Sequence, residues 1–523
     1  MTPTVPSVVF NTDSEHGRIK IYTDAEEITK DNVIEIFNSA YLLHQYNAIK
    51  EEDLFMYERG KQPVLYREKK TREDINEKIV INKASQIVDV HVGYCFGNPI
   101  TYVQRGKVED DLRKPEVTAD EDNNYIAMIN KMMAEQNKAK KDIELARDYM
   151  ICGLGYQMVW KNDNKSQYSP FKITTLNPRT TFVVYRNDAF REPIMGCTYF
   201  NHSDGSITAT MYTANMCFKL SNYVTDDSTY AGLTDTPNIL GEIPIVEFEH
   251  VDRMGVFEKV IPILNGINNL NSDRLNDVEQ FVQSLLWLNN CDIDDEKVKL
   301  FEKMGVIATK TNGERGEAKI MYLSQPLNQT EQETFANSLY RQVEEITSTP
   351  SWQEASGGST TGAMQLSNGW QSLELSAKSV EQSFVEPENQ ILRLVAKVIE
   401  LDKRNYFDIK KVDISDIEPH FTRNKNYDLV SKANALSTLL NAGVDGLWAF
   451  QTVGLFSDSE QAWIDSKDII EKVQKKMAKD EPKQTNPNNA DTDENGSGGV
   501  NNDPKEKVKE SVQPSAVAQV ENT

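Results

Sequence analysis

The stretch IVINKASQIVDVHVGYCFGNPITY, from Ile79 to Tyr102, combines two periodicities in one short segment. Gly93 and Gly97 interrupt its first pattern, Asn98-Pro99 marks a turn, and Ile100 to Val103 then has the β-branched and aromatic residues of a strand. Before that break, small and apolar residues recur at helical spacing, which predicts an amphipathic helix that buries Ala84, Ile87, Val88, His91 and Cys95. The simplest interpretation is a buried helix that leads into a strand, with His91 as a hydrogen-bonded core histidine rather than a metal ligand.

The charge balance limits what the chain can bind. Its 523 residues carry a net charge of −23. Residues 474–523 contain nine acidic residues and seven lysines, a balance of −2, so the other −21 lies on the rest of the chain. Tight binding of duplex DNA needs lysine and arginine to neutralise phosphates, so this acidity argues against a protein that clamps DNA. An acidic surface suits a protein past which DNA slides. The alternative explanation is that the acidic residues only keep the protein soluble.

The cysteines and the apolar content indicate a reduced, cytosolic protein. The N-terminal sequence lacks the features of a signal peptide, and no apolar stretch approaches the length that crosses a bilayer. The chain is long enough for several domains or for one elongated subunit with several parts. Five widely spaced cysteines without a C-x-x-C word predict neither a disulfide framework nor a zinc site: Cys95, Cys152, Cys197, Cys217 and Cys291.

Periodicity along the chain predicts helices on both sides of a β-rich block. The charged residues 107–124 are expected to form a loop, and Pro387 is expected to kink its helix. Two helices should have one buried face, made of Val33, Ile36, Phe37, Tyr41 and Tyr46 in the first and of Phe335, Leu339, Val343 and Ile346 in the other. Helices are expected over 31–58, 127–150, 261–286, 328–348, 363–404, 429–440, 444–453 and 457–473. Strands are expected over 156–160, 172–176, 181–185, 195–200, 208–213, 217–220 and 244–248.

The stretch from Ile79 to Tyr102 resembles a signature near the start of portal proteins of long-tailed double-stranded DNA bacteriophages, of the type found in siphophages of Gram-positive hosts. In that signature a helix with the pattern N-x-x-x-x-I-V-D runs into G-Y-x-x-G-x-P-I-T-Y. The matching residues are Asn82, Ile87, Val88, Asp89, Gly93, Tyr94, Gly97, Pro99, Ile100, Thr101 and Tyr102. Further stretches resemble the portal wing, stem helix and crown in the same order: Leu176–Phe200, Phe257–Glu279 and Leu439–Trp463.

The resemblance implies an α+β protein with the phage portal fold, which is mainly α-helical with a β-rich wing block, long stem helices and a helical crown. Residues 474–523 are rich in polar residues without aromatics, so composition predicts disorder there. The implied order is an N-terminal arm (1–29), a wing (30–255), a stem helix (256–286), a clip (287–326), a returning stem helix (327–348), a tunnel loop (349–362), a long kinked wing helix (363–404), a crown (405–473) and the disordered tail.

One set of residues is a candidate for contact with DNA, and a second set is a candidate for lining the channel. The segment from Thr349 to Gly362 is rich in Pro, Gly, Ser and Thr, which usually indicates a flexible surface connection. It has neither a lysine nor the phosphate-binding word G-x-x-x-x-G-K-[ST], so nucleotide binding is not expected. The resemblance makes it the tunnel loop, with Trp352, Gln353, Ser356 and Thr360 as candidate DNA contacts. The polar positions of the stem helix are candidates for lining the channel: Asn268, Asn271, Asp273 and Asp277.

The sequence contains no catalytic constellation. Its six histidines are scattered, and neither H-E-x-x-H nor the nucleophile word G-x-S-x-G occurs. Asp292, Asp294, Asp295 and Glu296 form the densest acidic cluster outside the tail, but they lack the glycine and the terminal Glu of a calcium loop, so a solvated face is favoured over a cation site. We therefore expect a protein that is not an enzyme and has no cofactor and no bound metal.

The resemblance also implies a function. The chain would form a homododecameric ring at one capsid vertex of the virion, assembled in the host cytoplasm and without contact to a membrane. Double-stranded DNA would enter through this ring during packaging and leave through it on infection. The implied partners are the terminase large subunit, a head-completion adaptor, and capsid and scaffold proteins. Two alternatives remain open: a helical interaction scaffold or adaptor without a channel, and a metal-dependent nucleic-acid-processing enzyme with its site near Asp292–Glu296.

Overall fold

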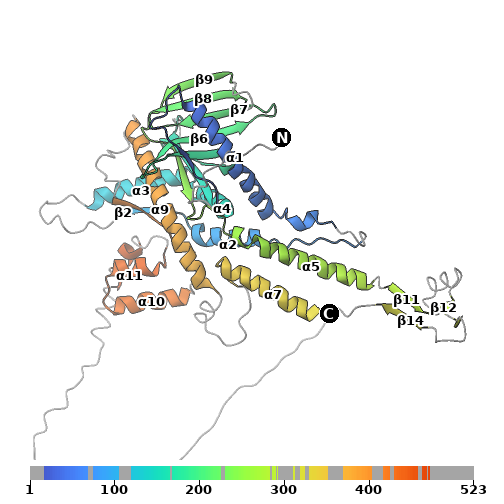
Figure 1. Cartoon of the computed structure of the whole chain (residues 1–523). Coiled ribbons are helices and arrows are strands. Elements are labelled where there is room, and N and C mark those ends of the chain that lie inside the picture. Colours follow the sequence, from blue (N-terminus) through green and yellow to red (C-terminus); the bar gives the residue numbers. More distant parts are fainter. Residues whose placement is uncertain are drawn as a thin grey trace, which may run out of the picture. The chain divides into compact units, whose positions relative to one another are not determined.

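A computed structural model describes residues 17–68, 75–104, 119–164, 168–224, 230–282, 285–289, 291–292, 310–311, 319–323, 329–351, 369–402, 416–423, 429–456, 462–467 and 469–470. The described chain mixes helices and strands, as expected for an α+β protein (Figure 1). It divides into two compact units, with the boundary between Lys425 and Asn426.

The first unit contains a six-stranded sheet with one long helix packed on it (Figure 1). The strand order is β1-β5-β6-β7-β8-β9, and only the pairing of β1 with β5 is parallel. Phe37 of the helix packs against Phe182 and Tyr223 of the sheet, with ring centroids 6.5 and 5.6 Å apart. The elements are β1 (Ile21–Thr23), α1 (Val33–Glu58), β5 (Thr181–Arg186), β6 (Pro193–Asn201), β7 (Ile207–Tyr212), β8 (Met216–Tyr223) and β9 (Gly232–Pro237).

The predictions for this region hold with two exceptions. The helix over 31–58 and the strands from 181 to 220 are confirmed. Strand β9 was not predicted, because its sequence GLTDTP is polar and largely exposed and so lacks an apolar alternation. Tyr46 was expected in the buried stripe of α1, but it is 45 % exposed, and His44 occupies the buried face instead.

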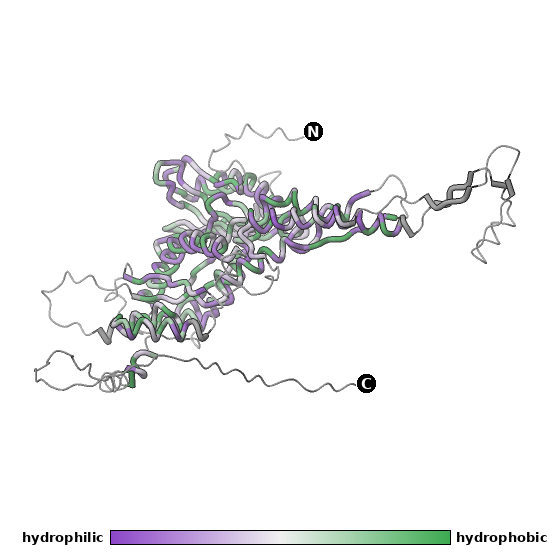
Figure 2. Tube along the Cα trace, turned by 90° about the horizontal axis from the view of Figure 1, so that it is seen from below, coloured by the Kyte–Doolittle hydropathy of each residue, from purple (hydrophilic) through white to green (hydrophobic). Residues whose placement is uncertain are grey.

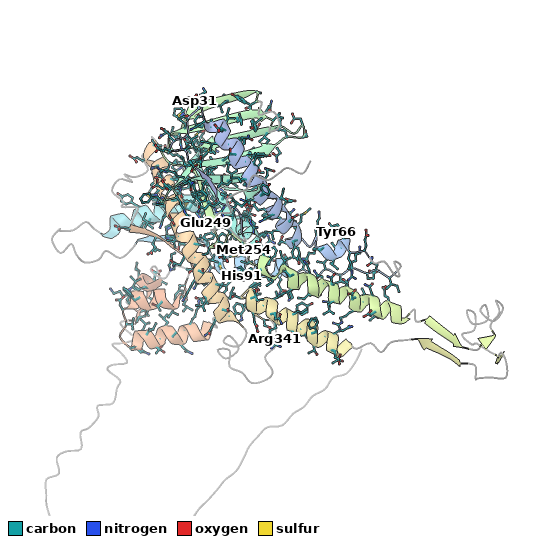
Figure 3. All side chains as sticks on the ribbon, in the orientation of Figure 1. Asp31, Tyr66, His91, Glu249, Met254 and Arg341 are labelled. Atoms are coloured by element: carbon teal, nitrogen blue, oxygen red, sulfur yellow. The ribbon has the colours of Figure 1, made fainter. Side chains whose placement is uncertain are left out.

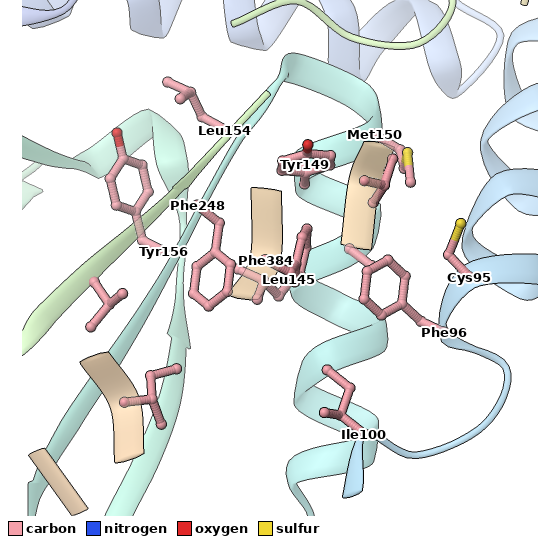
Figure 4. Packing of buried hydrophobic residues seen from close by; sticks show 14 of the residues in the cluster. Cys95, Phe96, Ile100, Leu145, Tyr149, Met150, Leu154, Tyr156, Phe248 and Phe384 are labelled. Atoms are coloured by element: carbon pink, nitrogen blue, oxygen red, sulfur yellow. The ribbon is translucent and has the colours of Figure 1, made fainter. Parts of the chain in front are cut away.

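A three-stranded sheet, β10-β3-β4, forms the centre of the larger core. Phe384 lies in the middle of this core, with its ring 4.7 Å from Phe96, 4.9 Å from Phe248 and 5.0 Å from Tyr149 (Figure 4). These four rings come from four elements far apart in the sequence, so the signature helix α2 is part of the core. The elements are α2 (Lys83–Phe96), α4 (Lys138–Cys152), β3 (Leu154–Lys161), β4 (Phe171–Leu176), β10 (Ile245–Glu249) and α9 (Trp370–Leu401).

Helix α9 continues through Pro387. Proline has no backbone N–H, so the carbonyl of Ser383 loses its usual helical partner at this point. The helix predicted over 363–404 is confirmed from Trp370 to Leu401, and residues 363–368 lie outside the described residues.

The helix predicted over 127–150 is in fact two helices, α3 (Ala119–Glu135) and α4. Asn137 separates them with a left-handed backbone (φ 52°). The break places the ammonium group of Lys138 in the core, 2.7 Å from Asp142 and 2.8 Å from Glu388. The predicted loop over 107–124 is therefore wrong for 119–124, which begin α3, and residues 107–118 lie outside the described residues.

Two further helices, α5 (Ile261–Val282) and α7 (Gln329–Ile346), pack against each other (Figure 1). Helix α5 begins at Ile261, as Pro262 in the first turn predicts. The prediction that it continues to 286 is wrong, because Leu285 and Leu286 belong to a strand that pairs with Leu323 and Tyr322 of a later strand. The intervening strands form two antiparallel pairs: β11 (Leu285–Asn289) with β14 (Lys319–Leu323), and β12 (Cys291–Asp292) with β13 (Lys310–Thr311).

The buried face of α7 differs from the prediction. Val343 is buried as expected, but Phe335 and Ile346, which were also expected to be buried, are 58 % and 55 % exposed. Ala336 lies on the buried face of the helix. The described residues of the first unit also form the short 3-10 helices η2 (Pro63–Tyr66), η3 (Pro178–Thr180) and η4 (Glu258–Val260), and the antiparallel pair β2 (Thr101–Gln104) and β15 (Ile417–His420). Strand β2 confirms the strand predicted after the signature helix.

The second unit contains α10 (Leu429–Asn441) and α11 (Gly446–Val453), which confirm two predicted helices. Asp445 caps α11 by accepting hydrogen bonds from the backbone N–H groups of Leu447 and Trp448. Residues 462–467 and 469–470 are helical, and the rest of the helix predicted over 457–473 lies outside the described residues.

Hydrophilic and hydrophobic residues alternate along the described elements (Figure 2). Within the described residues, no helix is long and apolar enough to span a membrane. Cys95, Cys152, Cys197 and Cys217 are buried and form no disulfide.

Candidate functional site

The two ends of the glycine-rich segment lie side by side. After α7 the chain turns at Ser348, whose backbone is left-handed (φ 54°), and the N–H of Thr349 donates to the carbonyl of Glu344 at 2.9 Å. Gly369 precedes α9 with φ 82°, and a Cβ added there would lie 3.7 Å from the Cα of Pro350. The chain between these points therefore starts and ends at one place, which we call the loop base (residues 347–351 and 369–372). The candidate DNA contacts Trp352, Gln353, Ser356 and Thr360 lie outside the described residues.

His91 of the signature helix supports one side of the loop base (Figure 3). Its Nε2 lies 2.8 Å from the carbonyl oxygen of Thr347, and its side chain is buried. Burial lowers the pKa of His91, and the nearby His250 acts in the same direction, whereas the hydrogen bond to Thr347 opposes them. The imidazole is therefore neutral, with its proton on Nε2, where it donates to this carbonyl. The expectation of a hydrogen-bonded core histidine is confirmed.

Tyr94, one turn further along α2, contacts the other side of the loop base. Its hydroxyl donates to Glu374 of α9 at 2.6 Å, and its ring lies 6.1 Å from that of Trp370. Arg423, just after β15, forms ion pairs with both Glu374 and Glu381. The signature helix thus touches the end of α7 and the start of α9, and Arg423 holds that part of α9 from another side.

A row of polar side chains on α5 holds an extended segment of the chain. These side chains accept hydrogen bonds from the backbone N–H groups of every second residue in that segment, at 2.7 to 2.9 Å. The pairs are Asn268 with Ile81, Ser272 with Ile79 and Asn276 with Glu77. Four residues of a helix rise about 6 Å, and two residues of an extended chain rise about 6.6 Å. The side chains on α5 and the N–H groups of the extended segment therefore recur at matching distances. This row, which we call the polar ladder, is almost completely buried.

The four candidate channel-lining residues have different surroundings. Asn268 is buried in the polar ladder and also donates to Gln62. Asn271 donates to the carbonyl of Ile267 and, at 3.3 Å, to the hydroxyl of Tyr340, and so joins α5 to α7. Asp273 pairs with Arg67 at 2.9 Å, but its side chain remains 53 % exposed, and Asp277 is partly exposed.

Sequence reasoning treated the polar middle of α5 as one wet face and missed the polar ladder. The available signal was the i, i+4, i+8 spacing of Asn268, Ser272 and Asn276. Its partner segment lies almost 200 residues earlier, so the pattern alone could not identify it.

No group of three His, Cys, Asp or Glu side chains that could hold a metal lies in the part of the chain that the structure describes. Only the backbone of Asp292 is described in the acidic cluster, and Asp294, Asp295 and Glu296 lie outside the described residues.

Comparison with known proteins identifies a family. The family model described as "Phage portal protein, SPP1 Gp6-like" matches residues 39–447. This span includes the signature helix, both sides of the loop base and the pair of helices α5 and α7. No curated protein matches the chain.

Proposed function

The chain belongs to the SPP1 Gp6-like family of phage portal proteins, and from this premise we propose that it forms the ring-shaped DNA channel at one capsid vertex. Twelve copies would form the ring. It would admit the genome during packaging, connect head and tail, and release DNA on infection. The role is structural and needs neither a cofactor nor hydrolysis of a nucleotide by this chain.

The observation that carries the proposal is the loop base. Pro350 and Gly369, which flank the proposed tunnel loop (349–362) and the residues that follow it, lie beside each other on a platform made of the signature helix and two long helices. A surface loop whose two ends are fixed on packed helices suits weak contact with a passing polymer. We assign this segment as the tunnel loop, with Trp352, Gln353, Ser356 and Thr360 as its DNA contacts.

The pair α5 and α7 is proposed as the stem, with 256–286 and 327–348 as its two halves and 287–326 as the clip. Asp273 and Asp277 are the candidate channel residues that reach the surface of the chain. Carboxylates at these positions repel phosphates and keep DNA from adhering to the wall. The other proposed boundaries are 1–29 for the arm, 30–255 for the wing, 363–404 for the long helix, 405–473 for the crown and 474–523 for the tail.

The proposed partners follow from the same role. The ring would bind the terminase large subunit, a head-completion adaptor, and capsid and scaffold proteins. It would assemble in the host cytoplasm and remain in the virion at the portal vertex.

The loop assignment is tested by replacing residues 352–362 with a short Gly-Ser linker, which keeps Thr349 to Ser351 and Gly369 in place. Because the two sides of the loop base nearly touch, such a linker can close without disturbing α7 or α9. We expect ring assembly to persist, measured by solution mass, and packaged DNA per particle to fall at least tenfold. Lys140→Gln, at an exposed position of α4 outside the loop, is the control and should package normally. Normal packaging by the linker variant would remove the loop from the mechanism.

A further inference from the structure

The start of helix α9 depends on contacts with other elements rather than on a cap of its own. Gly369 precedes the helix with a left-handed backbone (φ 82°) and, as a glycine, has no side chain that could cap the first turn. The first N–H groups of a helix lack intrahelical partners, so an end without a cap frays readily. Trp370 at this end is part of the loop base, so whatever holds the first turns of α9 also fixes one side of the loop base.

Arg423 joins two carboxylates on one face of α9. Its Nη1 and Nη2 atoms form ion pairs with Glu374 and Glu381, respectively. Seven residues of a helix rise about 10.5 Å and turn through about 700°, so these two glutamates lie about two turns apart and within about 20° of one line. The side chains are mostly buried, with exposed fractions of 10 % for Arg423, 21 % for Glu374 and 16 % for Glu381. Burial raises the pKa of Glu381, and Arg423 opposes that shift by favouring the carboxylate.

The position of Arg423 is fixed by elements other than α9. In the antiparallel ladder of β15 with β2, His420 lies opposite Thr101 of the sequence signature. Phe421 follows and packs against the larger core. Arg423 comes two residues later, so its backbone starts from a paired strand and a packed aromatic side chain. A guanidinium placed in this way holds α9 instead of following its movements.

Glu374 is held from a second direction as well. The hydroxyl of Tyr94 donates to it at 2.6 Å, and the ring of Tyr94 lies 6.1 Å from that of Trp370. Glu374 therefore has one partner on the signature helix and one on the segment that follows the partner of the signature strand. Together these two contacts determine how the first turns of α9, with Trp370, are oriented.

We propose that Arg423 is a positioning residue for the proposed tunnel loop, because it fixes the first turns of α9 and with them one side of the loop base. The inference rests on the proposed function, since it assigns a residue to the same loop. A planar guanidinium has donors for two carboxylates at once, whereas the ammonium of lysine is a single point charge. Without Arg423 the two carboxylates would be like charges in largely buried surroundings, and α9 would lose its link to the segment after β15.

The test compares Arg423→Lys with Arg393→Lys in the full-length chain. Arg393→Lys is the matched control, because Arg393 lies on the same helix but is 51 % exposed, with its Nε 3.9 Å from Glu242. Hydrogen exchange is measured by mass spectrometry over residues 372–381 of α9 and over β10 in the larger core. We expect Arg423→Lys to accelerate exchange over 372–381 by about tenfold or more and to leave β10 unchanged. A general loss of stability would accelerate exchange in both places.

A triple variant separates positioning from charge balance. Arg423→Gln/Glu374→Gln/Glu381→Gln leaves none of these three groups as an unpaired charge, so it should fold even if Arg423→Lys does not. If Arg423 acted only by neutralising the two carboxylates, this variant would exchange at the wild-type rate. We expect it to exchange over 372–381 about tenfold faster or more, because neutral amides form weaker hydrogen bonds than a charged guanidinium and carboxylate.

Packaging connects the residue to the loop. Rings of Arg423→Lys should keep the wild-type mass, and packaged DNA per particle should fall by about fivefold or more, whereas Arg393→Lys should package normally. Exchange at the wild-type rate over 372–381 in Arg423→Lys or in the triple variant would overturn the proposal, and so would faster exchange with normal packaging. A wild-type chain that forms no ring would instead refute the proposed function, and the exchange data would still decide whether Arg423 holds the start of α9.

Discussion

The Nε2 atom of His91 lies 2.8 Å from the carbonyl oxygen of Thr347, and this hydrogen bond joins the sequence signature to the base of the proposed tunnel loop. The two residues are 256 positions apart. Thr347 directly follows Ile346, the last residue of α7, at the end where helices leave C=O groups without an intrahelical partner. The signature helix therefore supplies a partner that α7 itself cannot supply.

We predict that His91→Leu destabilises the protein, because it leaves the Thr347 carbonyl buried without a donor. Such a group costs about 1 to 3 kcal/mol. His91→Gln keeps a donor and should lose less. Urea unfolding of both variants measures the difference, with the exposed His420→Leu as the control. Equal stability of His91→Leu and the wild type would show that the hydrogen bond contributes nothing.

The buried His44 should make stability depend on pH. Its ring nitrogens contact Tyr199 and Pro178, and burial lowers the pKa of His44 to about 4, although the hydrogen bond to Pro178 opposes this. In the unfolded chain the pKa of histidine is about 6.5, so the unfolded state binds more protons between these values. The contribution of His44 is therefore complete above pH 6.5 and is lost as the pH falls toward 4.

The loss that His44 causes over this range should be about 3 kcal/mol, from the difference of about 2.5 pKa units. The check is the free energy of unfolding from pH 7 to 4.5 for the wild type and for His44→Gln, which cannot titrate. The wild type should lose more stability than the variant over this interval. Parallel pH profiles would contradict the assignment of a neutral His44.

The polar ladder predicts an alternating pattern of amide protection. The N–H groups of Glu77, Ile79 and Ile81 bond to side chains of α5, so they should exchange with solvent more slowly than those of Lys78 and Val80. Ser272→Ala should selectively accelerate exchange at Ile79 and destabilise the protein by about 1 to 3 kcal/mol. Asp277→Ala is the control on the same helix. Uniform exchange across residues 77–81 would rule out the ladder.

The buried cation at Lys138 should be far more sensitive to mutation than an exposed one. Lys138→Met leaves the carboxylates of Asp142 and Glu388 buried without a cation, and breaking such a pair costs about 3 to 5 kcal/mol. The matched control lies on the same helix: Lys140 and Glu144 are 3.6 Å apart and exposed, so Lys140→Met should change stability by about 0.5 kcal/mol or less. Urea unfolding compares them, and similar losses in both would contradict the account.

How much the sequence could predict depends on how local each interaction is. The helix α2 and the strand β2 were predictable because their periodicity, turn and capping residues lie within one short stretch. The helix break at Asn137 was not predictable from local sequence. It brings Lys138 into the core, where its ion-pair partner Glu388 lies 250 residues later in the chain. Leu285 and Leu286 fit a helix by spacing, and only pairing with β14 makes them a strand.

The candidate site follows the same rule. The glycine-rich segment between two helices was visible in the sequence, but its base depends on His91, Tyr94 and Arg423 from other parts of the chain. The helices α5 and α7 of the proposed stem were predictable, whereas the direction in which the polar side chains of α5 point was not. Asn268 is polar, so the sequence alone suggests contact with water. In the structure its side chain instead accepts a hydrogen bond from the backbone N–H of Ile81.

The most direct test of the central claim is electron microscopy of the purified full-length chain together with its mass in solution, repeated after coexpression with the capsid and scaffold proteins of its phage. The account predicts closed rings of about twelve copies of the 59.4 kDa chain around a hole wide enough for duplex DNA. A chain that remains monomeric, or forms assemblies without a channel, in both preparations would contradict it.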